Sequence, residues 1–224
     1  MRTLSIGQYN IGIYEPSAKA ERIVYLHADS AEGAEIWRLL PEPKPVLAVI
    51  SGTDWNRDFS PWPADKVFSK GEDFSGGSKA YLDALTGLII PETEAALPHV
   101  PGMRAIAGYS LAGLFALWCA YSCDAFDRIA ALSPSAWFDG FTAFAGSHPI
   151  SPRLQCCVLS LGDREKNTRN PRMAAVETAV HTIENILIDK NISVRFILES
   201  GGHFNDIPGR IARGIAATYT SDHI

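Results

Sequence analysis

The chain has 224 residues, of which 46% are hydrophobic and 20% charged, and its 25 acidic and 20 basic residues give a net charge of −5. This composition is close to that of ordinary globular proteins and excludes disordered, collagen-like and coiled-coil chains. A chain of this length can fold as one domain, residues 1–224, without disulfides or a structural metal. The acidic balance leaves no basic face for nucleic acid, and no apolar run approaches the roughly 18 residues of a membrane span.

Strands are predicted where short apolar runs rich in β-branched residues recur: 3–13, 22–27, 46–50, 103–107, 128–132, 155–161 and 193–198. Several of these runs are apolar on both faces, which is typical of strands that helices cover on both sides. We expect the first two to form an antiparallel edge hairpin that turns near residues 16–20.

Helices are predicted where the apolar spacing or the capping residues fit: 78–97, 111–123, 170–188 and 206–219. The second of these is apolar nearly all round, as expected of a buried central helix. Asn170 caps the third, with Pro171 at its first position. Strands that alternate with helices predict an α/β fold with a mostly parallel sheet.

Residues 51–77 fit neither pattern. They are rich in Gly, Pro, Asp and Ser, but five aromatic residues are interspersed: Trp55, Phe59, Trp62, Phe68 and Phe74. A loop longer than about 15 residues in a compact domain is usually functional or disordered, and disordered segments are poor in aromatic residues. We therefore expect this segment to form a packed wall beside a site.

The four cysteines predict neither a disulfide scaffold nor a metal site. Cys119 and Cys123 lie in an apolar stretch, and the adjacent Cys156 and Cys157 would point to opposite faces of a strand. No CxxC or histidine–cysteine spacing typical of zinc occurs. The first ten residues lack the apolar core of a signal peptide, so we expect a cytoplasmic protein with buried, reduced cysteines.

A nucleophilic serine is predicted where a strand runs into Gly108-Tyr109-Ser110-Leu111-Ala112 and a helix begins at once. This order is a nucleophile elbow, with Ala112 in place of the usual second glycine. Small residues are needed on both sides of the serine because the turn is tight. The elbow places Ser110 Oγ at a helix N-terminus, which stabilises negative charge. A G-x-S sequence is common by chance, so its placement between strand and helix carries the prediction, and a plain tight turn is the alternative.

A general base must come from six histidines: His27, His99, His148, His181, His203 and His223. Only His203 follows a strand through a glycine-containing loop and precedes the last predicted helix. That is the position of the base in hydrolases whose chain order is serine, acid, histidine. We predict His203 as the base, with a solvated loop histidine as the alternative.

The orienting acid should follow the strand at 155–161, where Gly162-Asp163-Arg164-Glu165 offers two carboxylates. Glu165 lies far enough into the loop to turn back toward the histidine. Asp163 could orient the histidine instead, or brace the loop with Arg164 or Arg169. We favour Glu165 and keep Asp163 as the alternative, along with a Ser–His pair that has no third member.

An oxyanion hole is expected from the N–H of Leu111 and a second N–H in the loop after the strand at 46–50. Thr53 or Asp54 would supply that second donor, although Asp54 could equally cap the loop. Residues near the carboxyl edge of the sheet are candidate pocket walls: Trp55, Arg57, Trp62, Tyr109, Trp137 and Phe138. For each aromatic residue taken alone, ordinary packing is the alternative.

Four stretches together, 108–116, 132–138, 162–165 and 201–203, resemble the α/β-hydrolase esterases related to esterase D, ferric-siderophore esterases and feruloyl esterases. The similarity runs from Val46 to the C-terminus. The resemblance implies an α/β-hydrolase fold and a triad of Ser110, Glu165 (or Asp163) and His203. The chain shows no additional N-terminal domain of the kind that positions large siderophores in that group, so we expect a smaller acyl or aryl ester.

The sequence therefore predicts a serine carboxylesterase-type hydrolase that acts on a small-molecule ester through an acyl-enzyme. We expect no metal or organic cofactor and no nucleic-acid or membrane partner, and the sequence does not specify the oligomeric state. A thioesterase or acyltransferase of the same fold would differ only in leaving group or acceptor. A non-catalytic binding module is the other alternative, because a fold does not guarantee activity.

Overall fold

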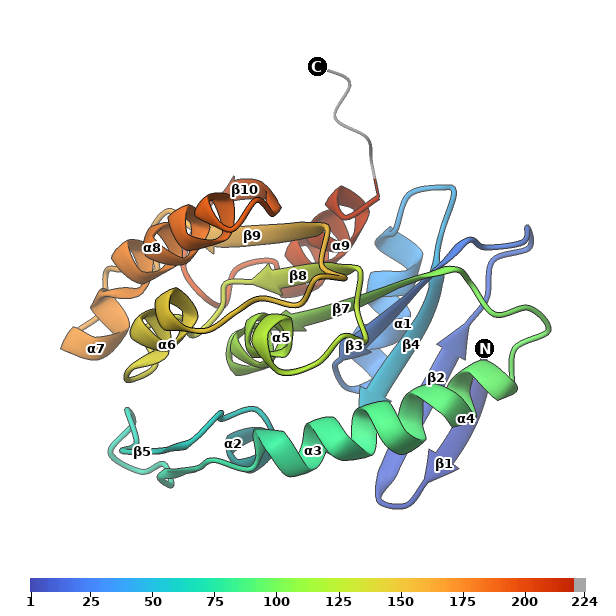
Figure 1. Ribbon diagram of the computed structural model, residues 1–224, viewed down its shortest axis with the longest axis horizontal. Helices are drawn as coiled ribbons and strands as arrows, with labels where there is room; N and C mark the ends of the chain where they lie inside the picture. Colours follow the sequence, from blue (N-terminus) through green and yellow to red (C-terminus); the bar gives the residue numbers. More distant parts are fainter. Residues whose placement is uncertain (220–224) are drawn as a thin grey trace.

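A computed structural model describes residues 1–219, which are organised around one eight-stranded sheet (Figure 1). Its strand order is β1-β2-β4-β3-β7-β8-β9-β10. Strand β2 pairs antiparallel with both of its neighbours, and the remaining strands pair in parallel. The strands are β1 (Arg2–Ile6), β2 (Tyr9–Tyr14), β3 (Arg22–His27), β4 (Val46–Ser51), β7 (Met103–Tyr109), β8 (Arg128–Leu132), β9 (Cys156–Gly162) and β10 (Ser193–Glu199).

Helices cover both faces of this sheet, and two separate apolar clusters form beneath them (Figure 1). One face carries α1 (Ser30–Leu39) and α9 (Ile207–Ala217). The other carries α3 (Ser78–Ala84), the π-helical turn η1 (Leu85–Ile89), α4 (Ile90–Ala95), α5 (Leu111–Ser122), α6 (Phe141–Ser147) and α8 (Val176–Asp189). The predicted α/β fold with a mostly parallel sheet is confirmed.

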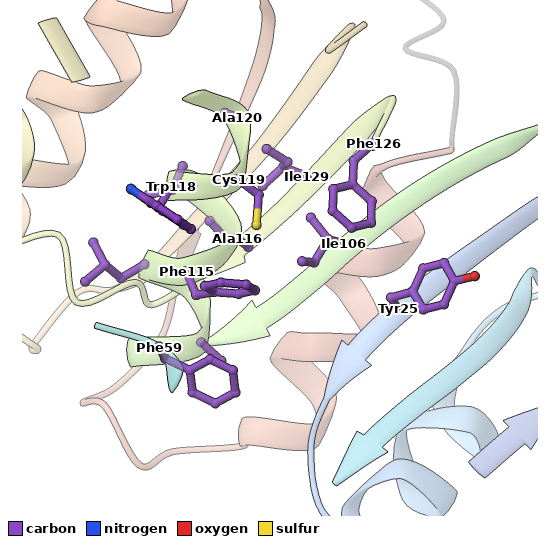
Figure 2. Packing of buried hydrophobic residues seen from close by; sticks show 14 of the residues in the cluster. Tyr25, Phe59, Ile106, Phe115, Ala116, Trp118, Cys119, Ala120, Phe126 and Ile129 are labelled. Atoms are coloured by element: carbon purple, nitrogen blue, oxygen red, sulfur yellow. The ribbon is translucent and has the colours of Figure 1, made fainter. Parts of the chain in front are cut away.

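Helix α5 is the buried central helix that its all-round apolar sequence predicts. Its residues 111–120 are all buried, and Figure 2 shows Phe115 and Trp118 packed among residues of the strands and loops around them. Phe59 reaches in from the segment after β4, with its ring centroid 5.6 Å from that of Phe115. The helix that begins directly after Ser110 is therefore fixed by its packing.

The N-terminal hairpin differs from the prediction. It turns at Gly7 and Gln8, between β1 and β2, and not near residues 16–20. Gly7 has φ +59°, a conformation that glycine adopts readily and that suits a two-residue hairpin turn. Both strands of the hairpin therefore come from the single run predicted at 3–13, while β3 lies inside the sheet between β4 and β7.

The helices differ in smaller ways. Helix α1 was not predicted, because only Gly33 and Ile36 of it are buried and its apolar stripe is weak. Helix α6 was missed as well. The helix predicted over 170–188 is interrupted at Ala175, so that α7 (Pro171–Ala174) precedes α8. Asn170 caps α7 as predicted, accepting hydrogen bonds from two backbone N–H groups.

The segment at 51–77, called the aromatic segment below, is ordered by contacts at its base. It contains α2 (Trp55–Asp58) and a short antiparallel pair, β5 (Pro63–Ala64) with β6 (Phe74–Ser75). The N–H of Gly77 donates to the carbonyl of Arg57 at 2.8 Å, so the two ends of the segment are bonded to each other. Among the described helices, none has the length and apolarity needed to cross a membrane.

Candidate active site

Ser110 occupies a tight turn between β7 and α5. Its backbone has φ 58° and ψ −120°, a strained conformation for a residue with a side chain. The turn is held from both sides, because Ser110 N–H donates to the Leu132 carbonyl at 3.0 Å and Ser135 N–H donates to the Ser110 carbonyl at 2.9 Å. A side chain at Gly108 would collide with the backbone of Ala112, which explains the glycine there.

His203 lies in the loop between β10 and α9, with Nε2 3.0 Å from Ser110 Oγ. The imidazole is one-quarter exposed, so one side of it faces the cavity described below. Tyr109 holds the loop from below, because its hydroxyl donates to the His203 carbonyl at 2.7 Å. The residue next to the serine therefore fixes the backbone of the histidine.

Glu165 completes a chain of contacts from Ser110. Its Oε2 lies 2.7 Å from His203 Nδ1, and its side chain is 3% exposed. Burial raises the pKa of this carboxyl, but hydrogen bonds from His203 and Ser133 outweigh burial and leave the pKa below its usual value. The group is thus an ionised acceptor at neutral pH, able to orient the imidazole.

Asp163 performs a different task in the same loop. Its Oδ1 accepts a hydrogen bond from the N–H of Gly201 at 2.7 Å and lies 3.7 Å from Arg164 Nε, with the side chain about half exposed. Asp163 therefore braces the backbone that leads to His203. Of the two acids left open by the sequence, the structure brings Glu165 to the imidazole and Asp163 to the loop.

The other described histidines are not hydrogen bonded to Ser110 or Glu165 in the described contacts, although His27 also lines the cavity. His27 is buried, and its Nε2 lies 2.7 Å from the hydroxyl of Tyr81. Burial lowers the pKa of His27 to about 3, so its imidazole is neutral. His148 and His181 are hydrogen bonded within their own helices or caps, and His99 is exposed. His223 lies outside the described residues.

The two predicted sources of the second oxyanion donor differ in the structure. The N–H of Asp54 donates to Asp58 Oδ2 at 2.8 Å, and the Asp54 side chain caps α2. Its N–H is therefore engaged, and Asp54 acts as a cap. Thr53 remains the predicted donor, together with Leu111, the first residue of α5, whose N–H has no partner within the helix.

Ser110 and His203 open into a cavity of about 410 Å³. Its walls are mainly apolar and include Trp55, Phe68, Phe74, Trp137, Val176 and Phe204. The volume lies in the range of small-molecule sites, and the polar lining residues include Ser110, His203 and Glu165. Three charged side chains line it away from the triad: Glu32, Lys66 and Glu72.

The predicted wall residues divide into two groups. Trp55, Tyr109 and Trp137 line the cavity. Arg57, Trp62 and Phe138 lie outside the described lining, contrary to the prediction. Arg57 turns to Asp58 at 2.8 Å, and Phe138 is buried behind Phe74, whose ring centroid lies 5.3 Å from its own. Trp62 in turn packs on Phe138, so these rings support the wall from behind.

Metal-ligating groups do not gather elsewhere in residues 1–219: no three His, Cys, Asp or Glu side chains there could hold an ion. All four cysteines are free thiols; three are buried and Cys123 is half-buried.

A sequence model of the family described as "Putative esterase" matches residues 35–186 of the 224. The chain belongs to this esterase family. The match contains Ser110 and Glu165 and ends before His203. The predicted resemblance to esterases is confirmed at the level of the family.

Known relatives of this esterase-family chain are distant. It is 27% identical over 145 residues to the uncharacterized protein YbbA of Bacillus subtilis (strain 168), covering 61% of this chain and 58% of YbbA, so the match spans less than two thirds of that relative. Many solved structures share the fold. The siderophore hydrolase EstB from Aspergillus nidulans has a TM-score of 0.74 at 17% identity, covering 97% of this chain and 93% of EstB.

The BES protein from Bacillus cereus has a TM-score of 0.71 at 17% identity, covering 98% of this chain and 94% of that protein. The siderophore hydrolase EstA from Aspergillus nidulans has a TM-score of 0.70 at 21% identity, with coverage of 92% and 88%. Likeness at these identities establishes the fold, which is the predicted α/β-hydrolase fold.

Sequence reasoning missed two residues that contact Glu165 in this esterase-family chain: Ser133, at 2.7 Å, and Arg210, at 3.0 Å. One signal for Arg210 was present. It stands in α9 between Ile207, Ile211 and Ile215, so a charged residue falls on the apolar stripe of a helix. Nothing local marks Ser133 as a partner, because the contact depends on how β8 and β9 pair.

Proposed function

We propose that this protein is a serine hydrolase that cleaves a carboxylic ester of a small acyl or aryl substrate. The observation that carries the proposal is the continuous chain Ser110 Oγ–His203–Glu165, with contacts of 3.0 and 2.7 Å, at the wall of an apolar cavity. Membership in an esterase family supports the same reaction class.

The contacts support a two-step reaction. His203 Nε2 takes the proton of Ser110 Oγ as the oxygen attacks the ester carbonyl, and the N–H groups of Leu111 and Thr53 stabilise the oxyanion. The protonated His203 then donates its proton to the departing alcohol, which leaves an acyl-enzyme. Water, deprotonated by His203, attacks that ester, the carboxylic acid departs, and Ser110 recovers its proton.

Glu165 has a specific part in this scheme. By accepting from Nδ1–H of His203, an ionised carboxylate fixes the imidazole tautomer that leaves Nε2 free to act as a base. It also stabilises the imidazolium formed when the serine is deprotonated. Its burial and its 2.7 Å contact suit both tasks.

The cavity supports a small ester with apolar groups. Indole and phenyl walls at Trp55, Phe74 and Trp137 favour acyl chains or aryl rings, because burying apolar surface there releases water. EstA and EstB are named as siderophore hydrolases. A siderophore ester is therefore one member of the substrate panel below.

Activity-based labelling tests the proposal. A fluorophosphonate should label the wild-type protein and Ser135→Ala, but neither Ser110→Ala nor His203→Ala. Ser135 is the matched control, because its Oγ lies 3.5 Å from Ser110 Oγ and it lines the same cavity. A folded wild-type protein that resists the probe would overturn the proposal and favour a binding module.

A substrate panel then tests the reaction class. It pairs short-chain aryl esters with the corresponding thioesters, adds a siderophore ester, and repeats each assay with an added alcohol acceptor. We expect the highest kcat/KM for the small oxygen esters, with water as the acceptor. A thioester preferred by more than about tenfold, or product formed mainly on the added alcohol, would replace the esterase proposal with the corresponding activity.

A further inference from the structure

Arg210 is the most deeply buried charged side chain next to the candidate triad. It lies on α9 with a relative exposure of 1%, although arginine is seldom buried without a partner. It is not among the described residues that line the cavity. The contacts of Arg210 are therefore with other residues of the protein and not with the cavity.

The guanidinium joins four separate segments. Its Nη1 lies 3.0 Å from Glu165 Oε1, 3.1 Å from the hydroxyl of Tyr109 and 3.4 Å from Ser133 Oγ. Its Nη2 donates to the Ser200 carbonyl at 2.9 Å. These partners follow or end β9, β7, β8 and β10, so one side chain bonds to the carboxyl ends of four adjacent strands.

A second route leads from Arg210 to the histidine. The Tyr109 hydroxyl accepts from Arg210 and donates to the His203 carbonyl at 2.7 Å. Ser200, which accepts from Nη2, lies in the same loop as His203. The carboxylate and the loop that carries the imidazole are therefore attached to the same cation.

Arg210 adds a permanent positive charge to the hydrogen bonds that Glu165 already accepts. Oε1 accepts from Ser133 Oγ and from Gly162 N–H, each at 2.7 Å, and Oε2 contacts His203. Those hydrogen bonds favour the ionised carboxylate against the cost of its burial, and a cation 3.0 Å away favours it further, whereas a protonated acid would no longer hold Nδ1–H.

Other titratable groups face this cluster without replacing that charge. Tyr109, from β7, is neutral because burial raises the pKa of its phenol. Asp163, from the loop after β9, is directed to the N–H of Gly201. Among the groups that contact Glu165 in the described residues, Arg210 is the one whose positive charge does not depend on pH.

We propose that Arg210 is a positioning residue that keeps Glu165 ionised and fixed, and ties it through Tyr109 and Ser200 to the loop carrying His203. The catalytic consequence rests on the function proposed above. The ionisation of Glu165 does not, and it can be measured separately.

Two substitutions of Arg210 separate charge from bulk. Arg210→Gln removes the cation, and Arg210→Lys keeps it. Arg213→Gln is the matched control, because Arg213 lies one turn further along α9 and pairs with Glu199 and Asp206 at 2.8 and 2.9 Å. The measurement is kcat and KM for an aryl ester between pH 5 and 9.

In Arg210→Gln we expect the acidic limb of kcat/KM to move up by about one pH unit, because the cation that opposes protonation of the coupled His203–Glu165 pair is lost. We also expect kcat to fall about tenfold, because Glu165 is less firmly held, with KM within about twofold of wild type. Arg210→Lys and Arg213→Gln should keep the wild-type limb. A folded Arg210→Gln protein with a wild-type limb would overturn the proposal. If circular dichroism shows that Arg210→Gln does not fold, Arg210→Lys provides the test. An acidic limb of kcat/KM that moves up by about one pH unit although lysine keeps the positive charge would overturn the proposal. An acidic limb at the wild-type pH would support it.

A ¹³C-carboxyl NMR titration provides a readout that needs no turnover. The Glu165 resonance is assigned by its loss in Glu165→Gln. We expect the pKa of Glu165 to rise by about one unit in Arg210→Gln and to stay at its wild-type value in Arg213→Gln. An unchanged Glu165 pKa in Arg210→Gln would overturn the proposed role of Arg210, whether or not the protein hydrolyses an ester. If the pKa rises but no ester is hydrolysed, the role of Arg210 stands and only the proposed esterase function is wrong.

Discussion

The inner end of the cavity and its mouth differ in how deeply their side chains are buried and in how many hydrogen bonds hold them. At the inner end Glu165 is buried and contacts four groups. Ser110 is held there by backbone hydrogen bonds, and the His203 carbonyl is held by the Tyr109 hydroxyl. At the mouth Phe68 and Phe204 are 60% and 82% exposed. For the proposed hydrolase, this contrast predicts that a rigid sheet edge sets the chemistry and that loops determine substrate recognition.

The two ends also come from different parts of the chain. Residues at the carboxyl ends of β7, β8, β9 and β10 supply the inner end, as expected for parallel sheets. The mouth is supplied largely by the aromatic segment and by the loop before α9. Substitutions at the inner end should therefore reduce kcat or stability, whereas those at the mouth should change KM. The predictions below test this division.

The largest effect is expected at the triad acid. Glu165→Gln should lower kcat about 10³- to 10⁴-fold, because the amide cannot hold the imidazole in the correct tautomer or stabilise the imidazolium. Asp163→Asn should lower kcat less than about tenfold, since its side chain contacts the Gly201 backbone and not the imidazole. Steady-state hydrolysis of a short-chain aryl ester measures both. If Asp163→Asn is the more severely impaired, the assignment of Glu165 is wrong.

The turn that holds the nucleophile should be the next most sensitive feature. Gly108→Ala should lower the free energy of unfolding by about 3 kcal/mol, because its Cβ would press on the backbone of Ala112 and Gly113. Gly87→Ala is the control: no atom lies within 4 Å of its Cβ, and we expect a change within about 1 kcal/mol. Urea unfolding of both variants provides the measurement. An equal loss of unfolding free energy in the two variants would show that a side chain at residue 108 fits without a steric clash.

Buried His27 makes stability depend on pH. Its folded pKa of about 3 is below that of an unfolded histidine, so the unfolded chain binds more protons between these values and stability falls as pH drops below about 6.5. Between pH 6.5 and 5 this group should contribute a loss of about 2 kcal/mol. Urea unfolding at both pH values should show that difference between wild type and His27→Gln. Parallel pH dependences in the two proteins would contradict it.

The smallest effect is expected at the mouth. Phe204→Ala and Phe68→Ala should each raise KM for an aryl ester about threefold, equivalent to a few tens of Å² of lost apolar contact, and leave kcat within about twofold. Leu198→Ala is the control, because Leu198 is 63% exposed but lies outside the described cavity lining. If Phe204→Ala or Phe68→Ala lowers kcat and leaves KM unchanged, the mouth does not differ from the inner end in the way proposed.

The sequence was most informative about site residues that have both a recognisable local motif and the expected order along the chain. Ser110 lies where a buried strand meets a buried helix and His203 follows a later strand, so both could be proposed from their surroundings, and Glu165 could be favoured over Asp163. Two carboxylates in one loop could not be separated from the sequence. Which of them turns inward depends on how the loops after β9 and β10 contact each other.

Features that depend on distant contacts were missed. Arg210 meets Glu165 only because α9 crosses beneath the ends of four strands, and no local pattern encodes that crossing. Trp62 and Phe138 have the composition of wall residues, but their side chains point away from the cavity toward one another. The hairpin at Gly7 was misplaced because a single apolar run hid two strands.

The pairing of β5 with β6 has a consequence for engineering. Pro63 pairs with Ser75 and Ala64 with Phe74, so residues 65–73 leave and rejoin the fold at adjacent points. A stretch whose ends are already clamped can be lengthened at little entropic cost, about 0.6 kcal/mol for each doubling. Grafted peptides of varied length and charge at 65–73 would thus diversify which esters are accepted while the hydrolytic machinery is left intact.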